Sequence, residues 1–297
     1  MKTKTIVCLV AAALAAVSGT LQAQPDAHYV PGSEGIKGAS LPPPGFYFKD
    51  YNLFYIADHA NNASGQNLGI PNFQALTFAN VPRAIWITDT TLLGGNVGVD
   101  ALLPLIYQSV KAGGYKSDTF GIGDFFAEST LSWHPQQFDF SAGFGVWAPT
   151  GDSANPPTTR VGSGFWTPMF TAGITWYPDA DKTWAISALS RYEFNTEQRD
   201  THDTPGQAYT LEWGVSKSCT KTIDVGVVGY YQEKVTGDTG SNPVGLTPHN
   251  QVAAIGPEVS LAIPSAMTFV SLRYNYEFLA ENRAQGHTVT LTLTKRF

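Results

Sequence analysis

The sequence predicts an all-β protein: a closed antiparallel transmembrane β-barrel of about 12 strands, preceded by a signal peptide. Three observations predict this fold class: a C-terminal strand with strict alternation, an export signal at the N-terminus, and long polar connections that alternate with short turns. Charged residues make up 14% of the 297 residues, against about 25% in soluble domains. Low charge, 29 glycines and 12% aromatic residues suit a wall between lipid and water.

The last eleven residues, 287–297, are the clearest strand. Val289, Leu291 and Leu293 alternate with threonines, so one face is apolar and the other carries hydroxyl groups. The chain then stops on an aromatic residue, Phe297, with no polar tail. A closed barrel protects such a strand by pairing it with the first one, whereas a sandwich leaves its edge exposed. If the apolar face contacts lipid, this is the final strand of an outer-membrane barrel.

The N-terminus has the three parts of a signal peptide. Lys2 and Lys4 form a charged start, residues 6–17 are mainly apolar, and small and polar residues lead to a cleavage position after Ala23. The apolar run is too short for a membrane-spanning helix. We therefore assign residues 1–23 to a signal peptide that is removed on export.

The remaining chain divides into a short segment and the barrel. Residues 24–44 are rich in proline and glycine and have no strand period, so they form either a periplasmic extension or a plug inside the barrel. Residues 45–297 form the outer-membrane β-barrel. Cys219 is the only cysteine left after cleavage, which excludes an intramolecular disulfide and a cysteine-based metal site.

The expected strands have lengths that suit a tilted span of the bilayer. They lie at residues 46–58, 83–93, 97–108, 119–133, 137–149, 164–177, 182–195, 208–217, 221–236, 251–263, 266–279 and 287–297. Long polar connections follow the odd strands and short turns follow the even ones, as in bacterial barrels with external loops and periplasmic turns. Both chain ends then fall on the periplasmic side.

Three prolines fall inside expected strands. A proline removes one hydrogen bond from a strand ladder, and a closed barrel has no edge where this loss is harmless. We expect Pro168 to lie near a rim, and Pro104 and Pro257 to mark bulges or shorter strands.

The alternation also assigns the faces of the wall. An Arg or Lys that faces lipid at the midplane costs about 2–4 kcal/mol, so the charged face must line the lumen. The candidate residues for the lumen and the solute path are Asp124, Glu128, Asp139, Arg191, Glu193, Glu212, Asp224, Arg273 and Glu277. Opposite charges are expected to pair across the bore, either to hold the wall together or to select solutes.

Aromatic residues gather near the short turns. Trp133, Trp176, Tyr177, Trp184 and Phe297 are expected to form a girdle at the membrane interface.

The sequence carries no motif for catalysis. It contains no HExxH zinc motif, no GxSxG nucleophile elbow and no P-loop, so we expect neither an enzyme nor a cofactor or metal site. The net charge of −6 argues against nucleic acid as a partner.

Two stretches resemble a known family. The run GSEGIKGASLPPPGFYFKDYNLFY at residues 32–55 resembles the start of the outer-membrane transporters named for the meta-pathway of phenol degradation. The run YNYEFLAENRAQGHTVTLTLTKRF at residues 274–297 is similar to their close, although Lys295 interrupts its alternating apolar positions. The resemblance implies a barrel that passes aromatic or other hydrophobic compounds, and it carries over no catalytic residues.

We therefore expect a porin-like channel in the outer membrane of a Gram-negative cell, for the passive passage of small, hydrophobic or aromatic compounds. A structural or adhesive barrel with a plugged lumen is the alternative, and a hydrolase at the rim is a more distant one. The expected partners are outer-membrane lipid, the small-molecule solute, and the barrel assembly machinery, which would recognise Phe297.

Overall fold

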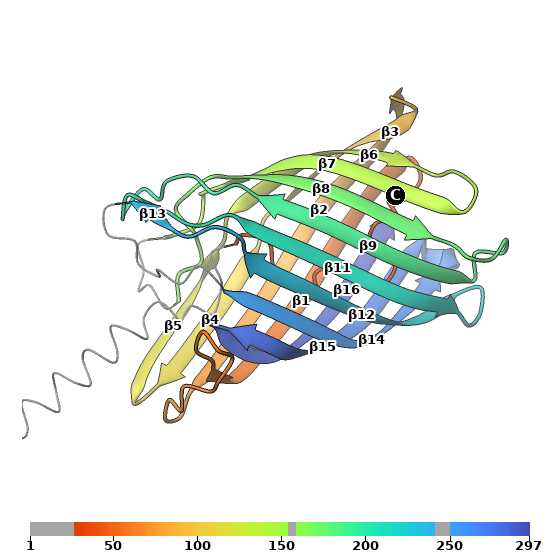
Figure 1. Ribbon diagram of the computed structural model, residues 1–297. Helices are drawn as coiled ribbons and strands as arrows, with labels where there is room; N and C mark the ends of the chain where they lie inside the picture. Colours follow the sequence, from red (N-terminus) through yellow and green to blue (C-terminus); the bar gives the residue numbers. More distant parts are fainter. Residues whose placement is uncertain (1–26, 154–158, 241–249) are drawn as a thin grey trace, which may run out of the picture.

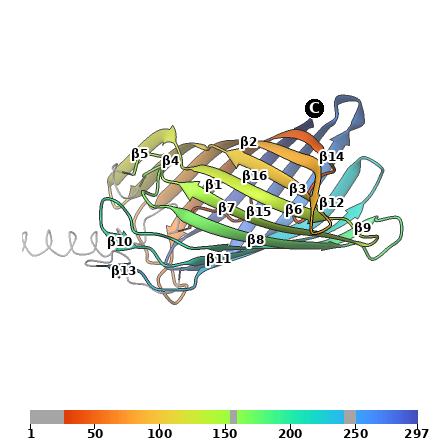
Figure 2. The same cartoon turned by 90° about the horizontal axis from the view of Figure 1, so that it is seen from above.

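The structure is a computed structural model that describes residues 27–153, 159–240 and 250–297. Most of these residues lie in long strands that form one barrel (Figures 1 and 2). The signal peptide expected at residues 1–23 lies outside the described residues. Within the described ranges, no helix is long and apolar enough to cross a membrane.

The elements follow one another along the chain with few interruptions. They are β1 (Gly45–Ala60), β2 (Gln74–Leu92), β3 (Gly95–Leu102), β4 (Leu105–Ala112), β5 (Tyr115–Ile122), β6 (Phe125–Trp133), β7 (Phe138–Ala148), β8 (Thr167–Trp176), β9 (Trp184–Glu193), β10 (Asp203–Thr204), β11 (Ala208–Ser218), β12 (Ile223–Lys234), β13 (Thr239–Gly240), β14 (Gln251–Ile263), the 3₁₀ turn Pro264–Ala266, β15 (Thr268–Glu281) and β16 (Ala284–Arg296).

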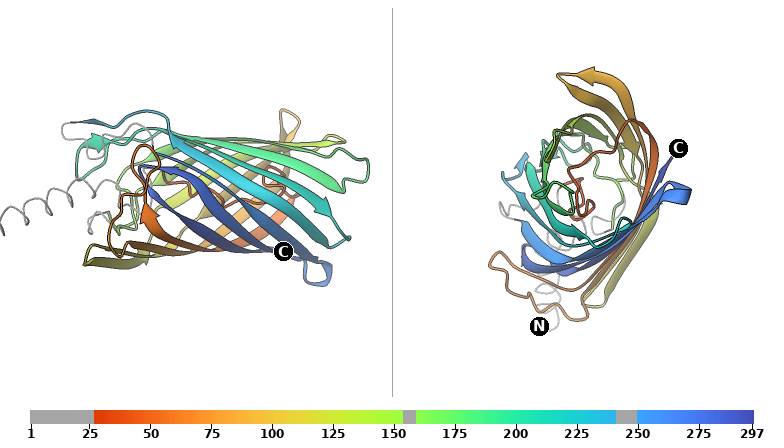
Figure 3. Two further views of the ribbon diagram at one scale, coloured as in Figure 1. Left: turned by 60° about the horizontal axis from the view of Figure 1, so that its bottom comes forward. Right: turned by 90° about the vertical axis from the view of Figure 1, so that its right-hand side faces the viewer.

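The barrel closes between its first and last strands, as the sequence predicts. β16 pairs antiparallel with β1 from Tyr47↔Arg296 to Ala60↔Ala284, and β1 also pairs with β2. The sheet has 14 strands, but β3 and β4 continue each other along one line of the wall, and so do β5 and β6. Subtracting these two continuations leaves the twelve strands predicted from the sequence. Figure 3 (right) shows the closed ring along its axis.

Of the two prolines expected to disturb the interior of the wall, Pro104 does so and Pro257 does not. The break between β3 and β4 falls at Leu103–Pro104, as predicted, and the facing break between β5 and β6 falls at residues 123–124. Pro168 is the second residue of β8 and lies at the rim, also as predicted. The prediction for Pro257 is wrong: β14 runs through it, and the register shift lies earlier, between Ala253 and Ala254.

Two connections are shorter than the sequence predicts, because they are tight hairpin turns. Residues 111–118 and 280–286 were expected to be long polar loops, but β4 and β5 are joined by Gly113-Gly114, and β15 and β16 by Asn282-Arg283. Gly113, Gly114 and Asn282 have φ values of 56°, 91° and 54°. Such left-handed residues allow two-residue hairpin turns, so the strands extend further than predicted. The connections at residues 61–73, 149–166 and 194–207 are long, as predicted, and they lie at the same end of the barrel. We call this end the long-loop end.

The opposite, short-turn end carries the aromatic girdle. Trp176, Trp184 and Phe297 are exposed there, as predicted. Tyr177 is the exception, because its hydroxyl points inward and donates a hydrogen bond to Asp139 at 2.6 Å. In the adjoining turn, hydrogen bonds from the Trp184 N–H and from the hydroxyl and N–H of Thr183 lower the pKa of Asp179 to about 2.

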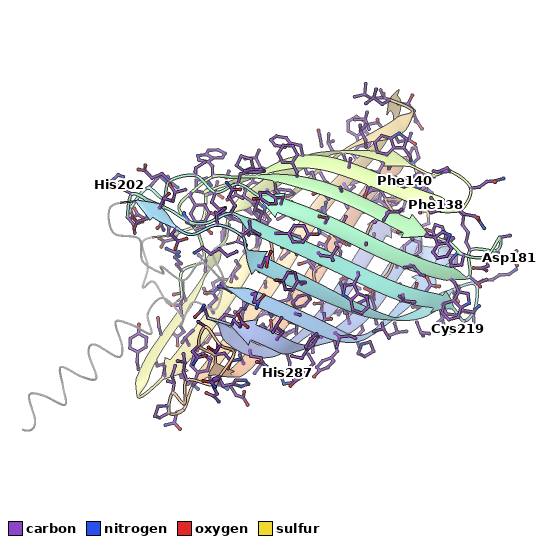
Figure 4. All side chains as sticks on the ribbon, in the orientation of Figure 1. Phe138, Phe140, Asp181, His202, Cys219 and His287 are labelled. Carbon is purple, nitrogen blue, oxygen red and sulfur yellow. The ribbon has the colours of Figure 1, made fainter. Side chains whose placement is uncertain are left out.

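The outer face is apolar along most of its height, and Figure 4 shows Phe138 and Phe140 pointing away from the wall. One polar cluster interrupts it at the middle of β1 and β2. Asp50, Asn52 and Asn80 point outward, since they alternate with inward Tyr51 and Leu53, and they bond one another. The Asn80 amide donates to Asp50 at 2.9 Å and to Asn52 at 3.1 Å.

Replacing this polar cluster with valine is expected to stabilise the barrel. In Asp50→Val/Asn52→Val/Asn80→Val, a carboxylate and two amides leave the lipid-facing wall, so the free energy of unfolding should rise by about 1–2 kcal/mol. Urea unfolding in phospholipid vesicles measures it, with outward-facing Ser190→Val as the control of smaller effect. A triple variant less stable than the native chain would contradict this expectation.

Candidate functional site in the barrel lumen

The chain before β1 lies inside the barrel. Residues 27–44, the lumen segment, run from the long-loop end, where His28 contacts Thr167, to the short-turn end, where β1 begins (Figure 3). This corrects the expectation that both chain ends lie on the periplasmic side: the start of β1 and the end of β16 meet at the short turns, but residue 27, the first described residue, lies at the opposite end. Of the two arrangements that the sequence left open for this segment, the described part adopts the one inside the barrel.

Carboxylates of the wall hold the backbone of the lumen segment. Glu193 accepts hydrogen bonds from the N–H groups of His28 and Tyr29 at 2.9 and 3.0 Å. Glu212 accepts one from the N–H of Glu34 at 3.0 Å. Because the segment forms no strand with the wall, these bonds to ionised acceptors replace the ladder that its backbone donors would otherwise need.

A second anchor lies on β14 and β15. Glu258 accepts a hydrogen bond from the N–H of Ile36 at 3.0 Å, and Arg273 donates one to the carbonyl oxygen of Gly32 at 3.0 Å. Glu258 and Arg273 also pair with each other at 3.4 Å. The wall therefore offers a charge of each sign to the matching backbone groups of the segment.

Asp124 fastens the long-loop end. Its carboxylate contacts His28 Nε2 at 2.9 Å and accepts hydrogen bonds from the N–H groups of Gly151 and Ser163 at 2.9 and 2.7 Å. The imidazole of His28 also stacks on Trp147, with ring centroids 5.5 Å apart. Asp124 sits at the β5–β6 break, so one side chain joins the wall, the lumen segment and the connection at residues 149–166.

That connection covers a gap in the wall. β5 is the end of the hydrogen-bonded strand order and pairs with β4 but with no strand on its other side among the described residues, so β5 and β7 are not bonded to each other. The hydroxyl of Thr159 lies 2.7 Å from that of Ser117 and 2.9 Å from that of Thr119. The loop thereby supplies polar partners where a neighbouring strand is missing.

Charged side chains divide the lumen at mid-height. Glu34 of the lumen segment meets Lys49 and Tyr51 of β1 and Arg83 of β2, and Arg83 also pairs with Asp100 at 2.8 Å. On the facing wall Arg191 pairs with Glu212 at 2.6 Å.

Two cavities meet at this charged layer. The apolar cavity, about 130 Å³, lies toward the long-loop end, and its lining includes Leu53, Ala79, Leu102, Ile106, Phe126 and Met169. The second cavity, about 280 Å³, lies toward the short-turn end and has a more polar lining, which includes residues 34–38 and serines and threonines of the wall. Glu34, Arg83, Glu128 and Arg191 line both. The layer therefore forms a barrier between the two cavities.

The structure places all nine predicted lumen residues on the inner side of the wall. Asp124, Glu128, Asp139, Arg191, Glu193, Glu212, Arg273 and Glu277 are buried, and Asp224 is half-buried and pairs with Lys37 at 2.7 Å. They do not form one cluster. Glu128 and Arg191 border the barrier, whereas Asp139 lies at the short-turn end and Glu277 lies on β15 between Tyr55 and Tyr230.

The nine predicted residues omit several charged residues of the wall and the lumen-segment acid that pairs with Lys49 and Arg83. Lys49, Arg83, Asp100 and Glu258 face the lumen, and Glu34 comes from the segment. The alternation of Lys49 with Tyr47 and Tyr51 was the available signal for one of them. Within the described ranges, no group of three or more His, Cys, Asp or Glu side chains is placed to hold a metal ion.

Comparisons with known proteins agree with this architecture. The COG4313 outer membrane channel from Pseudomonas putida F1 is 14% identical, with 91% of this chain and 100% of that chain covered and a TM-score of 0.76. The β domain of the Bordetella autotransporter BrkA is 8% identical, with 85% and 99% covered and a TM-score of 0.51. No curated protein sequence matches significantly.

The solved structures show that the fold is that of an outer-membrane β-barrel. The sequence profile of the family described as "Putative MetA-pathway of phenol degradation" matches residues 57–293. This match begins after the run at residues 32–55 and includes most of the run at residues 274–297, and it confirms that the chain belongs to that family.

Proposed function

We propose that the protein is a channel, not an enzyme, for the passive passage of small hydrophobic compounds, above all aromatic ones, across the outer membrane. The apolar cavity is the observation that carries this proposal. Its volume of about 130 Å³ is close to that of an engineered apolar cavity of about 150 Å³ that binds benzene. A barrel for hydrophilic solutes would instead have a polar, water-filled interior along its whole length.

The family and the fold support the same class of function. The family is described by phenol degradation, and the similar structure from Pseudomonas putida is described as an outer membrane channel. Passage is proposed to be passive, which means that each solute moves down its own concentration gradient. The Phe297 ring lies 5.8 Å from that of Phe46 at the seam of the barrel, and we propose that this end is recognised by the barrel assembly machinery, with lipid around the apolar belt.

Uptake by intact cells tests the proposal, because hydrophobic solutes cross plain lipid vesicles without help. Gram-negative cells that carry the protein are expected to take up labelled toluene faster than cells that lack it. Ala79→Phe, which fills the apolar cavity, should reduce uptake to the level of cells without the protein. The matched control is Ala172→Phe on the lipid-facing side of β8, which should leave uptake unchanged.

Equal uptake with and without the native protein would refute the channel. That result would favour the alternative of an adhesive or structural barrel whose filled lumen passes nothing.

A further inference from the structure

We propose that Lys49, Tyr51 and Arg83 form a carboxylate-binding site, and that an apolar, above all aromatic, carboxylate entering the lumen displaces Glu34 from it. The inference rests on the proposed channel function, and it adds a ligand class and a way in which the ligand opens its own path.

The geometry is that of a built site for one carboxylate. Lys49 Nζ lies 2.6 Å from Oε2 of Glu34, while the Tyr51 hydroxyl and Arg83 Nη1 donate to Oε1 at 2.6 and 3.2 Å. The donors come from neighbouring strands of the rigid wall, and the exposed fractions of the Lys49 and Arg83 side chains are 20% and 10%. Only the acceptor comes from the lumen segment. Charge-assisted bonds of this kind are roughly twice as strong as neutral ones.

The charges favour an exchange of one carboxylate for another. In the part of the chain that the structure describes, Glu34 is the one carboxylate paired with Lys49, whereas Arg83 has a second partner in Asp100. A neutral solute that displaced Glu34 would leave the half-buried ammonium group of Lys49 without a paired carboxylate. A second anion beside Glu34 would be repelled by it and by Glu128, whereas a replacement keeps the charge of the layer constant.

The apolar cavity determines the rest of the ligand. Tyr51 and Arg83 line this cavity as well as bonding Glu34. An apolar body of about one aromatic ring therefore fits into the cavity while its carboxylate reaches the three donors. The pairing of an apolar pocket with a few placed polar groups is the usual form of a small-molecule site.

Displacement of Glu34 also changes the barrier. Glu34 borders both cavities, so its departure from the donors removes the side-chain contacts that hold this stretch of the lumen segment against β1 and β2, while the backbone bonds to Glu212 and Glu258 remain. A ligand shifts such an equilibrium only through its different affinity for the two states. An aromatic carboxylate has different affinities for the two states. Glu34 occupies its site in the closed state, and the site is free in the state in which Glu34 has moved away.

Benzoate and benzyl alcohol, which differ in charge but share the ring, are the probes. Calorimetric titration of the purified full chain in detergent is expected to show benzoate binding, and single-channel recording should show that benzoate, not benzyl alcohol, raises conductance. Glu34→Gln removes the competing charge, so its benzoate affinity should rise several-fold. Lys49→Met and the shape-preserving Tyr51→Phe should weaken binding, and Lys217→Met on the outer face should not.

Heat-modifiable migration in gels establishes that each variant is folded before binding is compared. If Lys49→Met does not fold, Tyr51→Phe alone tests the loss of a donor. Benzoate affinities that are equal in the native chain, Glu34→Gln and Tyr51→Phe would overturn the site, as would equal responses to the two probes. Toluene uptake separates the proposals: if cells carrying the protein take up toluene but benzoate does not bind, the channel stands and the carboxylate site falls.

Discussion

A chain that lacks residues 28–40 is expected to conduct ions through an open lumen, with a single-channel conductance on the order of tenfold higher than that of the native protein. The reason is that the lumen segment separates the two cavities and occupies the bore along its length. Without it, Glu193, Glu212 and Glu258 lose the backbone donors that they bind and gain water instead. Because acids then dominate the lining, the open pore should also prefer cations.

Recording in planar bilayers measures both the conductance and, from reversal potentials in a salt gradient, the selectivity. The deletion retains residues 1–27 for export and residues 41–44 as the entry to β1. A control keeps the segment but locks it: Ala39→Cys with Ser187→Cys, in a Cys219→Ser background, joins positions where the Ala39 N–H lies 3.2 Å from the Ser187 hydroxyl. The oxidised control should retain native conductance. A folded deletion variant with native conductance would show that the segment is not the barrier.

Strand count and lumen face could be predicted because one rule governs both. Lipid excludes charge, so a period of two decides which residues face inward, and all nine predicted residues do. The rule fails on β1, where Lys49 faces inward but Asp50 and Asn52 face outward. With polar residues on both faces, the alternation is ambiguous, and the Lys49 and Tyr51 donors were missed.

The path of the lumen segment could not be predicted from a pattern. It has no strand period, and its partners are distant in sequence: His28 and Asp124 are separated by 96 residues. Its donors meet side chains of the wall, and no local signal specifies such pairs. The β5–β6 break could not be predicted for the same reason. Asp124 at this break is held by Gly151, Ser163 and His28, which are distant from it in the sequence.

Glu277→Leu is expected to produce the largest loss of stability, about 3–5 kcal/mol, because it removes the acceptor for several buried donors. Glu277 is 1% exposed and accepts hydrogen bonds from Tyr55 and Tyr230 at 3.0 Å each and from the N–H of Gly286 at 2.7 Å. Arg283 lies 3.8 Å from the same carboxylate. Together with Glu277 on β15, these donors link β1, β12 and β16, and leucine would leave the buried tyrosine hydroxyls without this acceptor.

Urea unfolding in phospholipid vesicles measures the loss, and Glu277→Gln separates its causes. Glutamine keeps the size of the side chain and one acceptor oxygen, so it should cost about 1–3 kcal/mol, less than leucine. The exposed turn residue Asp181 gives the control, since Asp181→Leu should change stability by no more than about 0.5 kcal/mol. Equal losses in Glu277→Leu and Asp181→Leu would mean that the tyrosine hydroxyls find other acceptors and that the wall does not depend on this carboxylate.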